Sequence, residues 1–278
     1  MTFLTRSIIV LVALAVLAGC QSRRISTETV YVEREVETIY AAAIERMENG
    51  SYGDAADQFD EVERQHPYSE WARRAMLMAA YSNYQAGNYE EAISDAERFI
   101  ALHPGNRSAP YAYYLVAISH FEQILDVGRD QQSTVNALNA LEQVVRRYPN
   151  TRYAQDARLK IDMTRDHLAG KEMSIGRWYL RRGFFLAAIN RFRNVLEDYE
   201  TTTHTPEALH RIVESYVALG VDEEATQVAA VLGYNFPGSV WYEDTYRLLT
   251  EEGIAIPNPD LQPENPSYWQ RLVDRLFG

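Results

Sequence analysis

Cysteine is almost absent from this sequence, which has a single one, Cys20, among 278 residues. An internal disulfide needs two thiols, so the chain cannot form one, and a cysteine-based metal site is excluded as well. Basic residues are also scarce, because 27 lysines and arginines stand against 39 aspartates and glutamates, giving a formal net charge of -12. Nucleic-acid binding requires a basic surface that neutralises phosphates, so this balance argues against a nucleic-acid partner.

The usual signs of an active site are missing too. The sequence has no glycine-rich phosphate loop, no nucleophile elbow and no cysteine nucleophile. Its six histidines show no metal-ligand spacing, and two of them, His66 and His103, merely precede prolines. Pairs of carboxylates are common in any acidic helical chain and do not by themselves indicate acid catalysis. We therefore predict that the protein is not an enzyme and has no metal or cofactor site.

The one long apolar run lies at the start of the chain. Residues 1–19 combine Arg6 with an apolar stretch over residues 8–18. That stretch is too short to cross a bilayer as a helix but has the length of a secretory signal. Residues 17–20, Leu-Ala-Gly-Cys, resemble the bacterial lipobox, in which the cysteine becomes the N-terminus and is acylated. We predict a signal peptide over residues 1–19 and a covalent N-acyl diacylglycerol group on Cys20.

Such an anchor would hold the protein on a membrane without a spanning helix, since each buried methylene contributes about 0.8 kcal/mol. Gln21 follows the cysteine. In enteric-type sorting an aspartate at that place favours the inner membrane, so by analogy the expected location is the outer membrane, lipid-anchored and facing the periplasm. Residues 20–35 are expected to form the anchor and a polar tether.

The rest of the chain follows a repeated pattern. Gly50 and Gly87 are each followed by a tyrosine two residues on, an alanine five residues on and a proline seventeen residues on. Gly220 begins a weaker copy that ends at Pro237. Between these marks, apolar residues recur at the spacing of one helix face. The pattern is typical of stacked helical hairpins of the tetratricopeptide type, in which each hairpin buries its apolar face against its neighbours.

We therefore predict an all-α fold, a right-handed superhelix of about five such hairpins followed by a C-terminal extension. Repeats one to three occupy residues 36–149, and repeats four and five occupy residues 150–237. The spacing of the prolines places a loop insertion at residues 124–133, inside repeat three. A separate additional helix is expected at residues 153–168, ahead of repeat four.

The extension, residues 238–278, departs from the repeat. Residues 241–253 predict a capping helix, and the prolines that follow predict an extended segment. Residues 267–278 place Trp269, Leu272 and Phe277 on one face of a last short helix. A helix of this length is marginal in isolation, so it is expected to dock on the protein's own body, on a partner or on a membrane surface.

The first helices of repeats two and three carry tyrosines where such repeats line a concave groove. Together with an arginine, these side chains could hold an extended peptide that has aromatic residues and a terminal carboxylate. The same tyrosines could instead pack in the core, and the sequence leaves both roles open. The candidate groove residues are Arg74, Tyr81, Tyr84, Tyr111 and Tyr114.

Charge is distributed in blocks along the chain. Residues 20–145 carry 10 basic and 20 acidic residues, residues 146–193 carry 12 and 4, and residues 194–278 carry 4 and 15. The blocks therefore sum to -10, +8 and -11. Almost all the positive charge is arginine, which suits bidentate pairing with carboxylates at interfaces. The basic block is either a docking surface or a set of ordinary ion pairs on helix faces.

Several segments resemble one protein family. They are YAYYL at 111–115, GRDQQ at 128–132, RRYPNTRYAQDA at 146–157, HLAGKE at 167–172 and WYLRRGFFLAAINRF at 178–192. With the lipobox and the repeats, they resemble the BamD (ComL-type) lipoproteins over about residues 33–237. The resemblance implies a non-enzymatic component of the outer membrane β-barrel assembly (BAM) complex, which folds and inserts β-barrel proteins.

The resemblance also implies partners. In that family the N-terminal repeats are thought to receive the C-terminal strand signal of unfolded barrel proteins, and the C-terminal repeats hold the periplasmic POTRA region of BamA and other BAM lipoproteins. Arg191 matches a family arginine implicated in this coupling. The other candidate interface residues follow from groove positions and are Arg177, Arg181, Glu207, His210 and Glu214. A function of another class remains open, namely a repeat lipoprotein that organises peptidoglycan enzymes or serves as a pilotin for a secretin.

Overall fold

The computed structural model describes residues 34–255. The predictions for the signal peptide, for Cys20, for most of the tether and for the last helix of the extension lie outside these residues. Within them the chain forms eleven α-helices and no strand, which confirms the predicted all-α class. No helix of this part is both long enough and apolar enough to cross a membrane.

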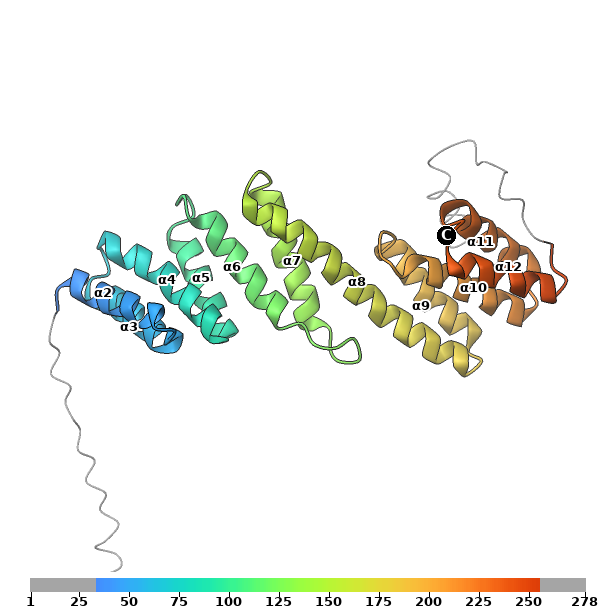
Figure 1. The fold of residues 1–278 in the computed structure, drawn as a ribbon, viewed down its shortest axis with the longest axis horizontal. Coiled ribbons are helices and arrows are strands. Elements are labelled where there is room, and N and C mark those ends of the chain that lie inside the picture. The colour runs from blue at the N-terminus through green and yellow to red at the C-terminus, as the bar shows by residue number, and fades with distance from the viewer. Residues whose placement is uncertain (1–33, 256–278) are drawn as a thin grey trace, which may run out of the picture. The chain divides into compact units, whose positions relative to one another are not determined.

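The helices pair into five antiparallel hairpins and a final helix (Figure 1). They are α2 (Val36–Glu48) with α3 (Tyr52–Gln65), α4 (Glu70–Ala86) with α5 (Tyr89–Leu102), α6 (Ala109–Glu122) with α7 (Gln132–Arg147), α8 (Arg152–Arg181) with α9 (Phe185–Asp198), α10 (Thr205–Leu219) with α11 (Asp222–Asn235), and α12 (Val240–Glu251). The predicted insertion is confirmed as the loop between α6 and α7, and the predicted capping helix is α12, which packs on α10 and α11.

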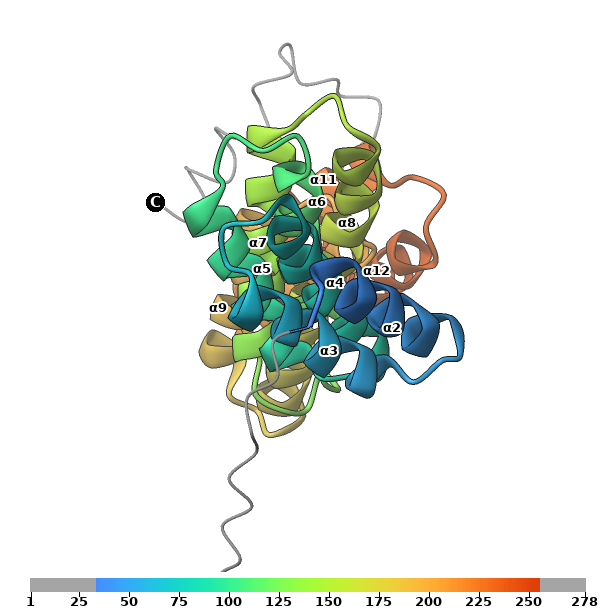
Figure 2. The ribbon, with the colours of Figure 1, turned by 90° about the vertical axis from the view of Figure 1, so that its left-hand side faces the viewer.

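Each helix packs mainly on the helices that precede and follow it in the chain. In addition, the first helices of successive hairpins contact one another, α2 with α4, α4 with α6 and α6 with α8. Figure 2 looks along this series from α2 and α3, which lie nearest the viewer. The first helices therefore form a continuous side of the stack, as the repeat pattern predicts.

The repeated glycines mark the turns inside the hairpins. Gly50, Gly87, Gly183 and Gly220 all have positive φ, between 71° and 80°. A side chain is strained in this left-handed conformation, so the turns need glycine. In the helix after each turn an aromatic or aliphatic side chain is buried, such as Phe59 in α3.

The helix α8 differs from the expectation. The sequence analysis placed a separate helix at residues 153–168 ahead of repeat four, whereas α8 runs without interruption over 30 residues and includes the first helix of that repeat. No proline interrupts this stretch. The first part of α8 packs against α7 and the last part against α9 and α10, so one helix belongs to two neighbouring layers.

A glycine fixes how closely α8 approaches α9. Gly176 lies inside α8, and a Cβ atom built there would fall 2.4 Å from a ring carbon of Phe192. The Phe192 ring is fully buried in the core that α8 to α12 share. Gly176 therefore lets the ring lie against the backbone of α8, and any side chain at this position would push it away.

Candidate functional site

A pocket of about 600 Å³ lies at the N-terminal end of the described chain, between α2, α4, α5 and the start of α6. Its lining combines three arginines, apolar side chains and few acids. The lining residues are Tyr40, Glu70, Arg73, Arg74, Leu77, Met78, Phe99, Asn106, Arg107 and Ser108.

The arginines of this pocket differ in their partners. Arg73 forms an ion pair with Glu70 at 3.0 Å. Arg74 lies over the ring of Trp71, 5.6 Å from its centroid, and neither Arg74 nor Arg107 pairs with a carboxylate among residues 34–255. The pocket thus offers two guanidinium groups without a counter-ion next to apolar surface, which suits a ligand that ends in a carboxylate.

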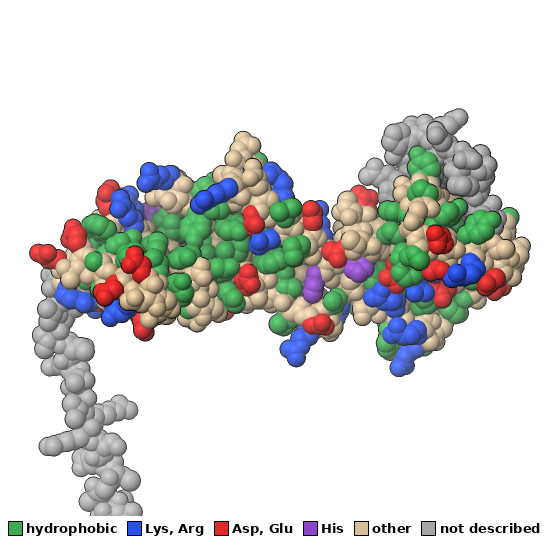
Figure 3. All heavy atoms as spheres, viewed as in Figure 1, with side chains coloured by type: hydrophobic (Ala, Val, Ile, Leu, Met, Phe, Trp, Pro, Cys, Tyr) green, Lys and Arg blue, Asp and Glu red, His purple; other side chains and the backbone are tan. Residues whose placement is uncertain are grey.

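The predicted groove tyrosines lie together, with one addition that the sequence analysis missed. Tyr111 and Tyr114 of α6 both pack against Tyr153 of α8, with ring centroids 5.5 and 5.2 Å apart. The Tyr114 hydroxyl donates a hydrogen bond of 2.6 Å to Asp156, also on α8. Figure 3 shows hydrophobic side chains, tyrosines included, gathered over α4 and α6 on the face in view.

The other two tyrosines extend this cluster along α4. The Tyr84 hydroxyl donates to Glu122 at 3.4 Å, and Gln85 donates to the Tyr81 hydroxyl at 3.0 Å. All four predicted tyrosines are partly buried, and Tyr81, Tyr84 and Tyr114 also pack on the core between α4 and α6. Burial raises the pKa of Tyr84 to about 12, with the Glu122 carboxylate adding to the effect. The Tyr84 hydroxyl therefore remains a protonated donor at neutral pH.

The five predicted groove residues thus fall into one strip. Arg74 and Tyr81 are two turns apart on α4, with Leu77 between them, so the pocket at Arg74 and the tyrosine cluster lie along the same side of this helix. Sequence reasoning missed Arg107 because it lies in the loop before α6, and it missed Tyr153 and Asp156 because it assigned them to an additional helix outside the groove. The segment 146–157, which contains both Tyr153 and Asp156, was the feature of the sequence that could have indicated them.

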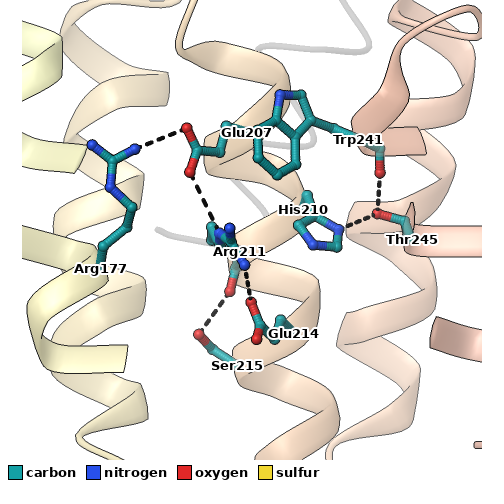
Figure 4. A network of polar contacts seen from close by, with 8 residues as sticks. All are labelled: Arg177, Glu207, His210, Arg211, Glu214, Ser215, Trp241 and Thr245. Carbon is teal, nitrogen blue, oxygen red and sulfur yellow. Dashed lines mark hydrogen bonds and ion pairs between the residues drawn. The ribbon is translucent and has the colours of Figure 1, made fainter. Parts of the chain in front are cut away.

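At the other end of the described chain, polar residues of α8, α10 and α12 form a network (Figure 4). Arg177 donates to Glu207 at 2.9 Å, and Arg211 reaches Glu207 at 3.5 Å and Glu214 at 2.8 Å. The Arg211 guanidinium also lies 5.2 Å from the Trp241 ring centroid. Glu207 is only 9% exposed, so its charge is held between two arginines rather than presented to solvent.

His210 lies in the same network and is buried. Its Nδ1 atom is 2.8 Å from the Thr245 hydroxyl, and its ring lies 5.4 Å from that of Trp241. Burial, followed by the neighbouring Arg211 guanidinium, lowers the pKa of His210 below its ordinary value. Among the predicted interface residues, Glu207 and His210 therefore join helices inside the chain, and their role toward a partner stays a prediction.

The buried histidine should make stability depend on pH. Because its folded-state pKa is lowered, His210 carries no penalty above about pH 6.5, where it is neutral in both states. Below that pH the unfolded state binds the proton more readily, so we expect the free energy of unfolding to fall as the pH drops toward the lowered pKa. His210→Gln should remove this part of the pH dependence in urea titrations at pH 7.5 and 5.5. An unchanged difference between the two pH values would contradict the assignment.

Arg191 and Arg181 occupy different surroundings. Arg191 of α9 forms an ion pair with Glu172 of α8 at 3.2 Å, and Asn194 donates to the same carboxylate at 2.9 Å. Arg181 is exposed at the end of α8. The six predicted interface residues thus lie at three places: the network around Glu207, the pair at Glu172 and the end of α8.

No group of three or more histidines, cysteines or acids that could hold a metal occurs in the part of the chain that the structure describes.

Comparison with known proteins gives consistent matches. Residues 32–232 match the family model YfiO, described as an outer membrane lipoprotein. A relative from Caulobacter vibrioides named outer membrane protein assembly factor BamD is 55% identical over 97% of this chain and 87% of its own length. Relatives with the same name from Rickettsia prowazekii and Neisseria meningitidis are 46% and 32% identical, covering 84% and 73% of this chain and 92% and 80% of their own lengths.

Proposed function

Because this chain belongs to the BamD family of outer membrane protein assembly factors, we propose that it is a non-enzymatic adaptor. It binds an unfolded β-barrel protein through its N-terminal hairpins and the barrel subunit of the assembly machine through its C-terminal hairpins. The family membership supports the assembly role. The arrangement of side chains supports substrate binding by the N-terminal hairpins and partner binding by the C-terminal hairpins.

The observation that carries the substrate role is the pocket at Arg74 and Arg107. A terminal carboxylate can pair with these two guanidinium groups, while Leu77, Met78 and Phe99 lie beside them. An aromatic side chain at the end of a barrel protein would bury apolar surface there and leave its carboxylate paired. The strip of tyrosines along α4 and α6 then receives the preceding residues of an extended peptide.

The partner role rests on the basic block and on Arg191. We propose that the C-terminal hairpins bind the POTRA region of BamA and other BAM lipoproteins. Arg191 is partly exposed, and its pairing with Glu172 orients the guanidinium without burying it. An acidic side chain of the partner could share it, which is how arginine acts at many polar interfaces.

The family also supports a proposed location for this protein. We propose that Cys20 carries the N-acyl diacylglycerol group and holds the protein on the inner leaflet of the outer membrane, facing the periplasm. Depletion of the protein should lower the amount of β-barrel proteins in the outer membrane and raise the envelope stress response. Unchanged barrel levels after depletion would overturn the proposed function.

Arg191→Ala is expected to weaken capture of BamA by about tenfold, which corresponds to about 1.4 kcal/mol. The substitution removes one charge-assisted contact but leaves Glu172 with the hydrogen bond from Asn194. Co-purification of BamA with the tagged protein, followed by quantitative blotting, measures the change. Arg98→Ala serves as the control, because Arg98 lies on α5 in the N-terminal hairpins, is ion-paired like Arg191 and is similarly exposed, 41% against 40%. Equal capture by the two variants would exclude Arg191 from the interface.

A further inference from the structure

The turn between α8 and α9 exposes large apolar side chains. Phe184 and Leu186 are 55% and 67% exposed, and Trp178, one turn before the end of α8, is 43% exposed. None of the three lines the N-terminal pocket or contributes to the network around Glu207. All three lie in the turn between α8 and α9 or within one turn of it.

The other hairpins show that the fold does not need these residues. Four hairpin turns share a glycine of positive φ, so equivalent positions can be compared directly. The residue after the glycine is Phe184 in this turn but serine, asparagine or valine in the others. The residue three places after the glycine is Leu186 here but glycine or glutamate elsewhere. Phe184 contacts the Tyr179 ring, with centroids 6.3 Å apart, but the other three turns form without an aromatic side chain at either position, so the repeat does not require Phe184 and Leu186.

The charge of this turn differs in the same way. Arg181 and Arg182 precede the glycine and are exposed, and the Arg182 guanidinium lies 4.4 Å from the centroid of the Trp178 ring. The helices α3, α5 and α11 each have acidic residues in their first turn, whereas α9 has none. Acidic residues in the first turn normally stabilise a helix, and α9 lacks this stabilisation. Their absence also means that no negative charge of this turn would repel an anionic surface.

We infer that the α8–α9 turn enters the headgroup layer of a membrane that contains anionic phospholipids. Tryptophan and phenylalanine rings favour the boundary between headgroups and acyl chains, and arginines next to them reach the lipid phosphates. Two exposed arginines with no acid in the following turn provide the matching charge. This contact would be a second attachment to the membrane, separate from the proposed acyl group on Cys20.

The scarcity of cysteine allows a direct test. Acylation occupies the thiol of Cys20, so a new cysteine would be the only reactive one in the acylated mature protein. An environment-sensitive fluorophore is attached to Leu186→Cys, and the protein is reconstituted into vesicles of phosphatidylethanolamine and phosphatidylglycerol that contain a lipid-borne quencher. The matched control is Glu90→Cys, which occupies the same position in the turn between α4 and α5.

We expect a blue shift and quenching of the probe at residue 186 and neither at residue 90. Both signals should be lost when Arg181 and Arg182 are changed to glutamate, and also in vesicles of phosphatidylcholine alone. Equal, solvent-like spectra at the two positions would overturn the inference. The inference would also be overturned if the probe at residue 186 became shielded only after the periplasmic domain of BamA is added. The turn would then be a protein interface.

Discussion

A protein that carries both Arg74→Glu and Arg107→Glu is expected to lose binding of a barrel-derived C-terminal peptide by more than about a hundredfold. Each charge-assisted hydrogen bond to a carboxylate contributes about 1.5–3 kcal/mol, and reversal adds repulsion between like charges. Neither arginine has a carboxylate partner within the described residues, so the substitutions break no internal ion pair. Fluorescence anisotropy of a labelled peptide with a free C-terminus measures the affinity.

A second peptide with an amidated C-terminus supplies the control. It lacks the terminal charge, so it should bind the unaltered protein weakly and should not distinguish that protein from the double variant. Helix content measured by circular dichroism should be the same in both proteins. If the unaltered protein binds both peptides with equal affinity, the pocket does not recognise the carboxylate.

Gly176→Ala is expected to lower the free energy of unfolding by about 1–3 kcal/mol, which is typical of overpacking in a close-packed core. The added methyl carbon would lie 2.4 Å from a ring atom of Phe192, so the ring or the α8 backbone must move. Elsewhere in a helix interior the same substitution stabilises by up to about 1 kcal/mol, since alanine has the higher helix propensity. Urea unfolding of the two proteins gives the difference.

Two variants separate the clash from other effects. Gly53→Ala in α3 changes a helical glycine whose added methyl carbon would have no atom within 4 Å, so it should not destabilise. In a Phe192→Leu background, which removes the ring atoms that clash, Gly176→Ala should cost much less than in the original protein. The explanation fails if Gly176→Ala is equally destabilising in both backgrounds.

The hairpins could be predicted from the sequence because the same local chemistry recurs in each of them. A glycine at nearly every hairpin turn, a proline after most second helices and an apolar face of 3.6-residue period carry enough information to locate nearly every helix. The end of α8 is the instructive exception. Residues 169–181 contain no signal that distinguishes a continuing helix from a new one, and continuity is decided by packing of α8 on α7 and α9 together.

The candidate sites were predictable to different degrees. Arg74 and the tyrosines were found because they occupy equivalent positions of one helix type. Arg107 was not, because a loop residue has no periodic position, and only the fold brings it beside Arg74. Conversely, Glu207 and His210 were selected because their spacing fits the groove. Spacing does not show that Glu207 already pairs with Arg177 and Arg211. Nor does it show that His210 already has a hydrogen-bond partner in Thr245.

The unbroken length of α8 connects the two ends of the described chain through one helix. Its first turns hold Tyr153 and Asp156 against the tyrosines of α6, and its last turns carry Glu172 and Arg177, which pair with α9 and α10. A helix of this length extends about 45 Å, so a tilt of about ten degrees at one end displaces the other by on the order of 8 Å. A peptide bound at the tyrosines of α4 and α6 that displaced Tyr153 would therefore move the surface around Arg191 through the α8 backbone itself, with no relay of side chains in between.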